Sequence, residues 1–365
     1  MNKIEFGDCK EIMKRWIDEG VKVQTCITSP PYYGLRDYGT ATWEGGDINC
    51  DHEGIKLGNN RNFLNEDGRK GNNNSLSSGD CVKCGAKRKD SQIGLEQTPK
   101  EYIDNMVDVF NHVKELLADD GTLWVNIGDS YSSHKDCKSI GQTLAKGTSR
   151  ENAHAMELGK SRVRDTKMLK SQGLKNKDLI GIPWMLAFAL REAGWYLRQD
   201  IIWHKPNPMP ESVTDRCTKS HEYIFLLSKS DKYYFDHVAI KEQGVTPAGT
   251  KGAKGSVERQ NQFGVNARPP EYKIYDGMRN KRDVWSVNVR PYKGAHFATY
   301  PTALIEPCIL AGSRKNDIVF DPFMGSGTTA QVALQHGRQY LGCELNKEYE
   351  KLQQERINHG QGQLS

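Results

Sequence analysis

The sequence lacks the long apolar runs that mark membrane proteins and the apolar N-terminal stretch that marks exported ones. Its longest nearly unbroken apolar run, residues 179–190, has 12 residues, whereas a membrane-spanning helix needs about 20. The N-terminal stretch MNKIEFGDCKEIM carries charges where a signal peptide needs its apolar segment. We therefore expect no membrane contact and a cytoplasmic protein whose nine cysteines stay reduced, without a disulfide framework.

Internal repeats at a fixed period are also absent, which argues against a solenoid or an array. The 365 residues correspond to two or three structural units, or to one large core with insertions. Apolar residues make up 36% and charged residues 27% of the chain. This composition is polar for a folded enzyme but too apolar for a disordered chain, so we expect a core with long polar excursions.

An excess of positive over negative charge is confined to two segments. Residues 132–178 hold 11 Lys and Arg against 5 Asp and Glu, and residues 236–295 hold 11 against 6. The remainder of the chain has 29 basic and 35 acidic residues, although the whole carries a net charge of +5. Two basic segments on an acidic core fit a surface that contacts a polyanion, and solvated loops are the alternative.

Short β-rich runs alternate with helical patterns along the core. Strands are predicted at residues 23–28, 122–127, 196–203, 222–227, 317–320 and 340–344, and helices at 101–118, 183–192 and 328–336. This alternation predicts an α/β fold with helices on both faces of a mostly parallel sheet. Residues 44–95, 132–178 and 241–282 interrupt the pattern.

A glycine-rich turn follows the predicted strand near the C-terminus, in DIVFDPFMGSGTTAQVALQHGRQYLGCELN. The strand ends at Asp321, Gly325 and Gly327 form the turn, and a second strand ends at Glu344. Glycines at such a turn let the backbone approach a ligand, and an acid about 20 residues further on binds ribose hydroxyls. The turn lacks the Lys of a phosphate-binding loop, so we expect a nucleoside with a cationic or amino group, such as S-adenosylmethionine.

The N-terminal strand delivers a rigid polar cluster, Ser29, Pro30, Pro31 and Tyr32, to the end of the sheet where α/β proteins place their active sites. Paired prolines fix the backbone, so the Ser29 hydroxyl and the carbonyls are presented rigidly. Acceptors beside an aromatic ring suit a flat base with an exocyclic amine. A proline-rich turn with Tyr32 capping the core is the alternative.

TSPPY with Arg36 and Tyr38, together with DPFMGSGTT, resembles the permuted beta group of site-specific DNA amino-methyltransferases (cytosine-N4/adenine-N6 family, TSPPY type), in which the catalytic motif precedes the cofactor motif. The resemblance extends to residues 120–131, 194–230 and 296–301. It implies a circularly permuted, Rossmann-like S-adenosylmethionine-dependent methyltransferase fold with inserted polar and basic recognition segments. The helix that in unpermuted enzymes precedes the first strand is then expected at residues 301–312.

On this basis we expect catalytic core at residues 1–43, 96–131, 179–240 and 291–365. A zinc-binding insertion is expected at 44–95, a basic DNA-facing lid at 132–178 and a target recognition region at 241–290. The resemblance assigns base binding to Ser29, Pro30, Pro31 and Tyr32, with Tyr32 stacking on the base. The residues it assigns to S-adenosylmethionine are Asp8, His296, Asp321, Phe323, Gly325, Ser326, Gly327 and Glu344.

The expected reaction moves the methyl group of S-adenosylmethionine to the exocyclic amine of a base flipped out of double-stranded DNA. Within the family, Ser before Pro-Pro-Tyr favours cytosine, giving N4-methylcytosine, while adenine, giving N6-methyladenine, is the alternative. The catalytic motif lacks the Pro-Cys nucleophile that carbon methylation of cytosine needs. A DNA-binding module without catalysis and an RNA or protein methyltransferase are less favoured alternatives.

Two close-set donor pairs lie in the first insertion, Cys50 with His52 and Cys81 with Cys84. Such pairs can close a tetrahedral structural zinc site, which would hold together a Gly/Asn-rich segment with little core of its own. Four unconnected reduced residues are the alternative.

The recognition region interleaves basic and aromatic residues, which suits phosphate and base contacts. The predicted DNA contacts are Lys251, Lys254, Arg259, Arg268, Lys281 and Arg282. A cognate restriction endonuclease is an expected partner of such a system, and a prokaryotic or phage-encoded enzyme would associate with the nucleoid when bound to DNA.

Overall fold

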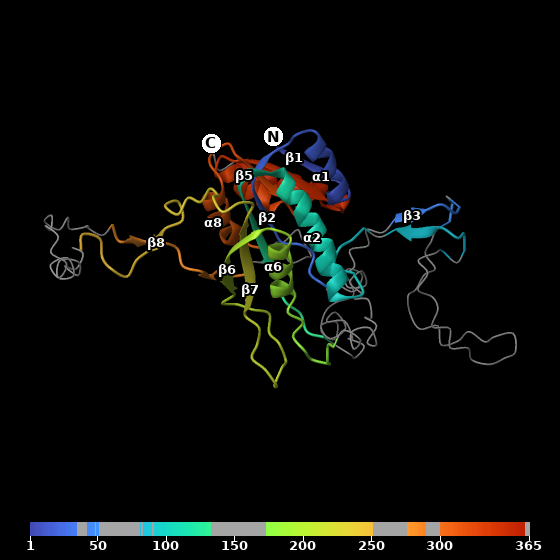
Figure 1. Cartoon of the computed structure of the whole chain (residues 1–365), viewed down its shortest axis with the longest axis horizontal. Helices are drawn as coiled ribbons and strands as arrows, with labels where there is room; N and C mark the ends of the chain where they lie inside the picture. The colour runs from blue at the N-terminus through green and yellow to red at the C-terminus, as the bar shows by residue number, and fades with distance from the viewer. Residues whose placement is uncertain are drawn as a thin grey trace. The chain divides into compact units, whose positions relative to one another are not determined.

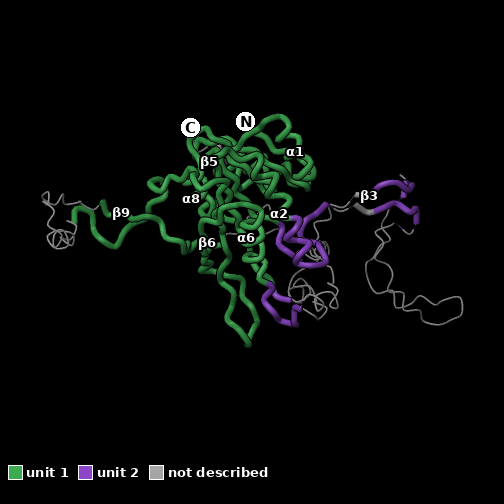
Figure 2. The backbone as a smooth tube through the Cα atoms, viewed as in Figure 1, with its two compact units in different colours: residues 1–30, 106–130, 181–365 green, residues 31–105, 131–180 purple. Residues whose placement is uncertain are grey.

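The computed structural model describes residues 1–34, 42–47, 49–50, 81, 83–89, 91–132, 173–250, 276–289 and 300–361. The chain separates into two compact units (Figure 2): unit 1 comprises residues 1–30, 106–130 and 181–365, and unit 2 comprises residues 31–105 and 131–180. The boundary after residue 30 falls inside the TSPPY motif. Within the described ranges, no helix combines the length and apolar character needed to cross a membrane.

An eight-stranded sheet forms the centre of unit 1 (Figure 1). In spatial order its strands are β1 (Lys3–Phe6), β12 (Gln339–Glu344), β11 (Ile318–Asp321), β2 (Val23–Thr28), β5 (Leu117–Ile127), β7 (His221–Ser228), β6 (Tyr196–His204) and β10 (Val284–Ser286). The first five run parallel, β7 runs antiparallel to both neighbours, and β10 is parallel to β6. The six predicted strands are confirmed, and β1 and β10 add the two edges.

Helices cover both faces of this sheet, as predicted. Side chains of α8 (Thr302–Gly312) and α9 (Thr328–Gln335) share a buried cluster with Val319 of β11 and Trp124 of β5. On the other face, Trp16 of α1 (Cys9–Asp18) meets Phe320 with ring centroids 6.1 Å apart. Trp184 of α6 (Ile182–Glu192) meets Phe225 at 5.2 Å. The predicted helices at 183–192, 301–312 and 328–336 are thereby confirmed within one residue at each end.

The predicted helix at 101–118 is wrong at both ends. α2 covers Pro99–Leu116, and Leu117 already begins β5, where it pairs with Val23 of β2. The sequence hides this junction because Leu116 and Leu117 are both apolar and both fully buried. The pairing of Leu117 with β2 therefore ends the helix at Leu116, whereas helical spacing alone would extend it to residue 118.

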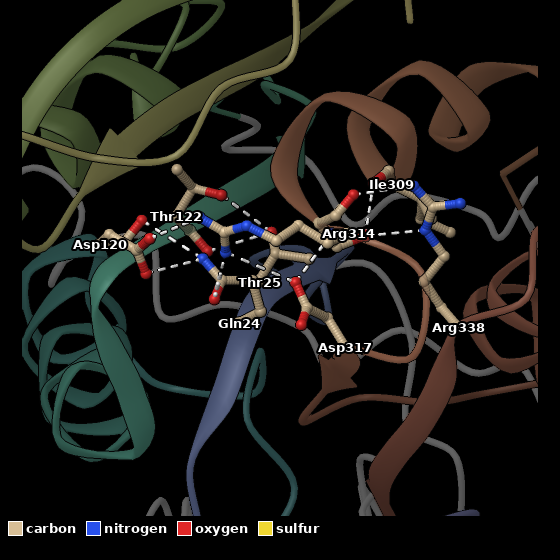
Figure 3. Close-up of polar contacts among 9 residues, drawn as sticks. Gln24, Thr25, Asp120, Thr122, Ile309, Arg314, Asp317 and Arg338 are labelled. Carbon is tan, nitrogen blue, oxygen red and sulfur yellow. Dashed lines mark hydrogen bonds and ion pairs between the residues drawn. The ribbon is translucent and has the colours of Figure 1, made fainter.

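Polar side chains join the N-terminal ends of three strands (Figure 3). Gln24 of β2 and Arg314, before β11, each donate a hydrogen bond of 3.0 Å to Asp120 of β5. Although burial raises the pKa of Asp120, these hydrogen bonds and the Arg314 charge lower it overall. The Arg314 guanidinium also lies 3.8 Å from the ring centroid of Tyr234. This network therefore links β2, β5 and the segment before β11 near the N-terminal ends of the parallel strands.

The remaining elements are small. Near the C-terminus, the 3-10 helix η2 (Lys347–Tyr349) leads into α10 (Glu350–Gln361). In unit 1, β8 (Glu242–Gln243) and β9 (Met278–Arg279) form an antiparallel pair inside the expected recognition region. In unit 2, β3 (Thr42–Glu44) pairs with β4 (Lys87–Lys89) in an antiparallel hairpin.

Candidate active site

The glycine-rich turn between β11 and α9 is held from two sides. Gly325 and Gly327 have φ values of +52° and +85°, a region in which a side chain is strained. The Gly325 N–H donates to Glu344 Oε2 at 2.7 Å, and its carbonyl accepts from Gln353 Nε2 at 2.7 Å. Arg356 donates to the Ser326 hydroxyl. Strand β12 and helix α10 therefore fix the backbone of the predicted cofactor turn.

Asp321 is fully buried at the end of β11. Its Oδ1 accepts from Thr28 Oγ1 at 2.6 Å and from the Phe323 N–H at 3.0 Å. Its Oδ2 accepts from Thr329 Oγ1 at 2.6 Å and from the Tyr300 hydroxyl at 2.9 Å. Burial raises the pKa of Asp321, and the hydrogen bonds oppose that shift. Four protein donors therefore surround the carboxylate.

Glu344 and Asp8 lie at the carboxyl ends of neighbouring parallel strands. Phe6 of β1 pairs with Glu344 of β12, and the Gly7 N–H donates to the Glu344 carbonyl at 2.8 Å. Asp8 then caps α1, with its Oδ1 accepting from the Lys10 N–H at 2.8 Å. Burial raises the pKa of Glu344 to about 7, because hydrogen bonds from the backbone of Asn346, Gly325 and Leu345 offset it only in part. Glu344 thus contacts the glycine-rich turn directly, and Asp8 follows the neighbouring strand β1.

The catalytic motif begins directly after β2, whose six residues are all buried. Thr28, the last of them, bonds Asp321, so β2 and its neighbour β11 are joined where Ser29 and Pro30 begin. Pro31 and Tyr32 belong to unit 2. There the Pro31 carbonyl accepts from the Tyr102 hydroxyl at 2.9 Å. A Cβ on Gly94 would lie 3.0 Å from the Tyr32 carbonyl oxygen, so Gly94 permits a close approach to the motif.

Several predicted residues lie outside the described ranges: Arg36, Tyr38, His52, Lys251, Lys254, Arg259, Arg268 and His296. Of the predicted DNA contacts, Lys281 and Arg282 are described. The Lys281 ammonium lies 5.0 Å from the ring centroid of Trp285, and Arg282 Nε donates to Glu242 Oε1 at 2.8 Å. Arg282 remains largely exposed.

The sequence prediction omitted four residues that donate hydrogen bonds to the candidate site. They are Thr28 and Thr329, which bond Asp321, and Gln353 and Arg356, which bond Gly325 and Ser326. Thr28 and Thr329 stand inside the recognised TSPPY and GSGTT motifs, so their position was a usable signal. Gln353 and Arg356 are buried polar residues of α10. A hydrophobic pattern does not reveal such residues, because their role is to form hydrogen bonds with a loop that is distant in the sequence.

The chain matches a known family over most of its length. The family model N6_N4_Mtase, described as DNA methylase, matches residues 23–355. The type II methyltransferase M.Cfr9I of Citrobacter freundii is 41% identical over 344 residues, covering 94% of this chain and 83% of the relative. The type II methyltransferase M.SmaI of Serratia marcescens is 40% identical over 356 residues, covering 97% and 90%.

Two solved structures share the fold. PvuII DNA methyltransferase (cytosine-N4-specific) has a TM-score of 0.53 at 16% identity, covering 98% of this chain and 86% of that one. TTHA0409 of Thermus thermophilus, complexed with S-adenosyl-L-methionine, has a TM-score of 0.50 at 18% identity, covering 99% and 96%. The sheet order, the glycine-rich turn and the family match agree, and the chain belongs to the N6_N4_Mtase family of S-adenosylmethionine-dependent DNA amino-methyltransferases.

Proposed function

We propose that this chain methylates the exocyclic amine of cytosine in double-stranded DNA, and that Ser29, Pro30, Pro31 and Tyr32 form the base site. The hydrogen bond between Thr28 and Asp321 carries the proposal. It joins the strand that leads into the base motif to the strand that leads into the cofactor turn, and the two strands are neighbours in the sheet. Methyl transfer needs both substrates held at a fixed separation, and this contact supplies a fixed reference point.

The residues around the turn fit a nucleoside cofactor. Glu344 and Asp8 offer carboxylate oxygens, which accept hydrogen bonds from ribose hydroxyls. Residues 322–327 of the turn lack the Lys of a phosphate-binding loop, which suits S-adenosylmethionine better than a nucleotide. Phe323, Ser326 and Gly327 complete the turn. Asp321 acts on the cofactor through the turn backbone, since its four donors all come from the protein.

S-adenosylmethionine supplies an electrophilic methyl group on a sulfonium sulfur. The chain's own task is to prepare the amine that receives it. Acceptors at the Ser29 hydroxyl and the Pro30 carbonyl draw the amine hydrogens and localise a nitrogen lone pair that the ring otherwise delocalises. Tyr32 stacks on the flipped base and offsets part of the cost of extruding it, which is a few kcal/mol. No general base is required before the transfer, because the nitrogen releases its proton to solvent only after it has gained the methyl group, whose bond to sulfur breaks with the electron pair left on the sulfur.

Ser29 favours cytosine, since within the family Ser before Pro-Pro-Tyr is commoner in the enzymes that methylate cytosine. Incubation of the purified chain with duplex DNA and isotope-labelled S-adenosylmethionine, followed by digestion and mass spectrometry, tests this. N4-methyldeoxycytidine is the expected product. N6-methyldeoxyadenosine alone would contradict the choice of base, and labelling of RNA or protein instead of duplex DNA would contradict the substrate.

Three further parts of the proposal rest on sequence. The order of the motifs supports a circular permutation, because the base-motif strand β2 precedes the cofactor strand β11 in the chain yet lies beside it in the sheet. Residues 241–290 and 132–178 contact the DNA, as their basic charge favours. Since M.Cfr9I and M.SmaI are named type II methyltransferases, an endonuclease of the same sequence specificity is the expected companion.

A further inference from the structure

Three cysteines from two separate stretches of unit 2 converge beside the β3–β4 hairpin. Cys50 follows β3, and Cys81 and Cys84 precede β4. The three Sγ atoms all lie within 4.8 Å of one another, and those of Cys50 and Cys81 are 3.8 Å apart. Zinc–sulfur bonds of about 2.3 Å at tetrahedral angles place two sulfurs about 3.8 Å apart. The spacing therefore matches thiolates around one metal ion, and it is far longer than the roughly 2.05 Å of a disulfide bond.

A tight turn holds two of these sulfurs in place. The Gly85 N–H donates to the Cys81 carbonyl at 2.8 Å, and the Cys81 N–H donates to the Ala86 carbonyl at 2.6 Å. Cys81 is only 3% exposed and Ala86 is fully buried. On the other side, the Cys50 N–H donates to the Asp47 carbonyl at 3.0 Å. The backbone hydrogen bonds thus hold the cysteine sulfurs close to one another.

We propose that Cys50, Cys81 and Cys84 bind a single structural zinc ion. Three thiolates and one further donor give the closed tetrahedral site typical of structural zinc, which leaves no open position for a substrate or an activated water. His52, two residues beyond Cys50, is the fourth ligand that the sequence offers, and it lies outside the described residues. The ion joins the two ends of a segment, 51–80, that has few apolar residues to bury.

The backbone at Gly46 lies close to Cys84 and Ala86. A Cβ at this position would lie 2.7 Å from Cys84 Sγ, 2.8 Å from Ala86 Cβ and 2.9 Å from the Ala86 nitrogen. Gly45 provides a matched comparison, since its φ of +73° nearly equals the +74° of Gly46, yet nothing lies within 4 Å of a Cβ built there. Both positions disfavour a side chain on backbone grounds. Of these two glycines, Gly46 is the one at which the backbone comes close to a cysteine sulfur.

Metal analysis of the full chain, purified without chelators, is the first test. Near-stoichiometric zinc is expected in the wild type, with loss from Cys81→Ser and from Cys84→Ser, and a weakened site in His52→Ala. Iron in place of zinc, no metal at all, or a Cys50–Cys81 disulfide in preparations kept under reducing conditions would overturn the proposal. Full zinc retention in both serine variants would overturn it as well.

The glycine pair is the second test, with a chelator competition as readout. Gly46→Ala should weaken zinc binding relative to Gly45→Ala, because the added Cβ would displace Cys84 Sγ. The expected loss is roughly 10- to 100-fold, the size seen when the surroundings of metal ligands are altered at other sites. Equal zinc affinity in the two variants would contradict the site. Calorimetric binding of S-adenosylmethionine is expected to be unchanged in both, because the cofactor residues belong to unit 1. Zinc content is independent of the proposed methyl transfer, so the two proposals can fail separately.

Discussion

At the scale of single residues, Asp321 and Glu344 differ in what their carboxylates bind. Asp321 bonds several parts of the protein, whereas Glu344 keeps acceptor capacity for a ligand. All four bonds to the Asp321 carboxylate come from the protein, so this group fixes β2, β11 and α9 in place. Glu344 accepts two backbone N–H bonds on separate oxygens and is 9% exposed. Its remaining acceptor capacity is what a ribose hydroxyl needs.

The raised pKa of Glu344 predicts a pH dependence. The folded chain holds a proton on Glu344 up to about pH 7, whereas the unfolded chain releases it near 4.5. The contribution of Glu344 to the free energy of unfolding is therefore fully present below pH 4.5 and is lost as the pH rises toward 7, by about 3 kcal/mol. Glu344→Gln should remove this slope in denaturant unfolding measured across that range.

Cofactor binding should follow the opposite trend, because the ionised carboxylate accepts from ribose hydroxyls. Affinity for S-adenosylmethionine, measured by calorimetry, should rise with pH through about 7 in the wild type and stay level in Glu344→Gln. The difference between the two proteins isolates Glu344, since Asp321 is present in both. Parallel pH profiles would show that Glu344 does not ionise in this range.

Stacking at Tyr32 can be separated from cofactor binding. Tyr32→Ala should weaken binding of the flipped base by about 1–3 kcal/mol, whereas Tyr32→Phe keeps the ring and should lose much less. Ser29→Ala should lower turnover, because the amine loses an acceptor. All three variants should bind S-adenosylmethionine as the wild type does. Steady-state methylation with calorimetry checks this, and equal turnover in the alanine and phenylalanine variants of Tyr32 would rule out stacking.

At the scale of elements, the pairing of β2 with β11 brings the two motifs together. Thr28→Val removes the hydroxyl that donates to Asp321 while keeping the shape of the side chain. We expect the free energy of unfolding to fall by about 1–3 kcal/mol, since the acceptor is an acid. Turnover should fall more than the affinity for S-adenosylmethionine, because Ser29 and Pro30 lose their fixed position relative to the turn.

Thr25→Val is the matched control on the same strand. The Thr25 hydroxyl is fully buried and bonds Thr122 of β5, three residues before Thr28 and toward the other end of the sheet. Its removal should lower stability by about 0.5–1.5 kcal/mol and leave turnover of the folded protein unchanged. If both variants reduce turnover equally, the Thr28 contact serves only the fold.

Central elements could be predicted from the sequence, whereas peripheral ones could not. The strands β2, β11 and β12 are buried along nearly their whole length, and β5 is buried from Gly121 onward, so apolar residues stand at consecutive positions in all four. The edge strand β1 pairs on one side only and is mostly half-exposed, which leaves little pattern in four residues. Helix α10 buries polar side chains, Gln353 and Arg356, against the cofactor turn, a role that hydrophobic periodicity does not detect.

Prediction of the site was limited in the same way. Gly325, Glu344 and Ser29 could be proposed from the sequence because glycine-rich turns and polar residues at strand ends have local sequence signatures. The enclosure of Asp321 was not, since its donors come from residues 28, 300, 323 and 329, which only the folded sheet brings together. Helix α1 has its buried residues at positions 9, 12, 13 and 16. That spacing predicts a helix, but the sequence prediction omitted it.

At the scale of the whole molecule, the excess of basic over acidic residues falls in residues 132–178 and 236–295. Of the predicted recognition residues, Arg282 is 66% exposed on its side chain yet shares Glu242 with Arg279. Glu242 therefore holds two guanidinium groups in position, and its pKa is lowered by hydrogen bonding to Arg282, with Arg279 adding to the effect. Such a cluster keeps a net positive charge available to a phosphate while limiting the freedom of the side chains.

This arrangement predicts how DNA binding depends on salt. Replacing Lys251, Lys254, Lys281 and Arg282 by Gln should weaken binding to duplexes of any sequence, because phosphate contacts release counterions irrespective of the bases. Removing one cation that neutralises a phosphate should flatten the plot of log affinity against log salt by about 0.9. A matched variant that neutralises the four exposed lysines Lys14, Lys22, Lys232 and Lys315 removes the same charge from other surfaces. Its salt slope should stay near that of the wild type. Equal slopes in the two variants would show that net charge, and not the recognition region, sets the affinity for DNA.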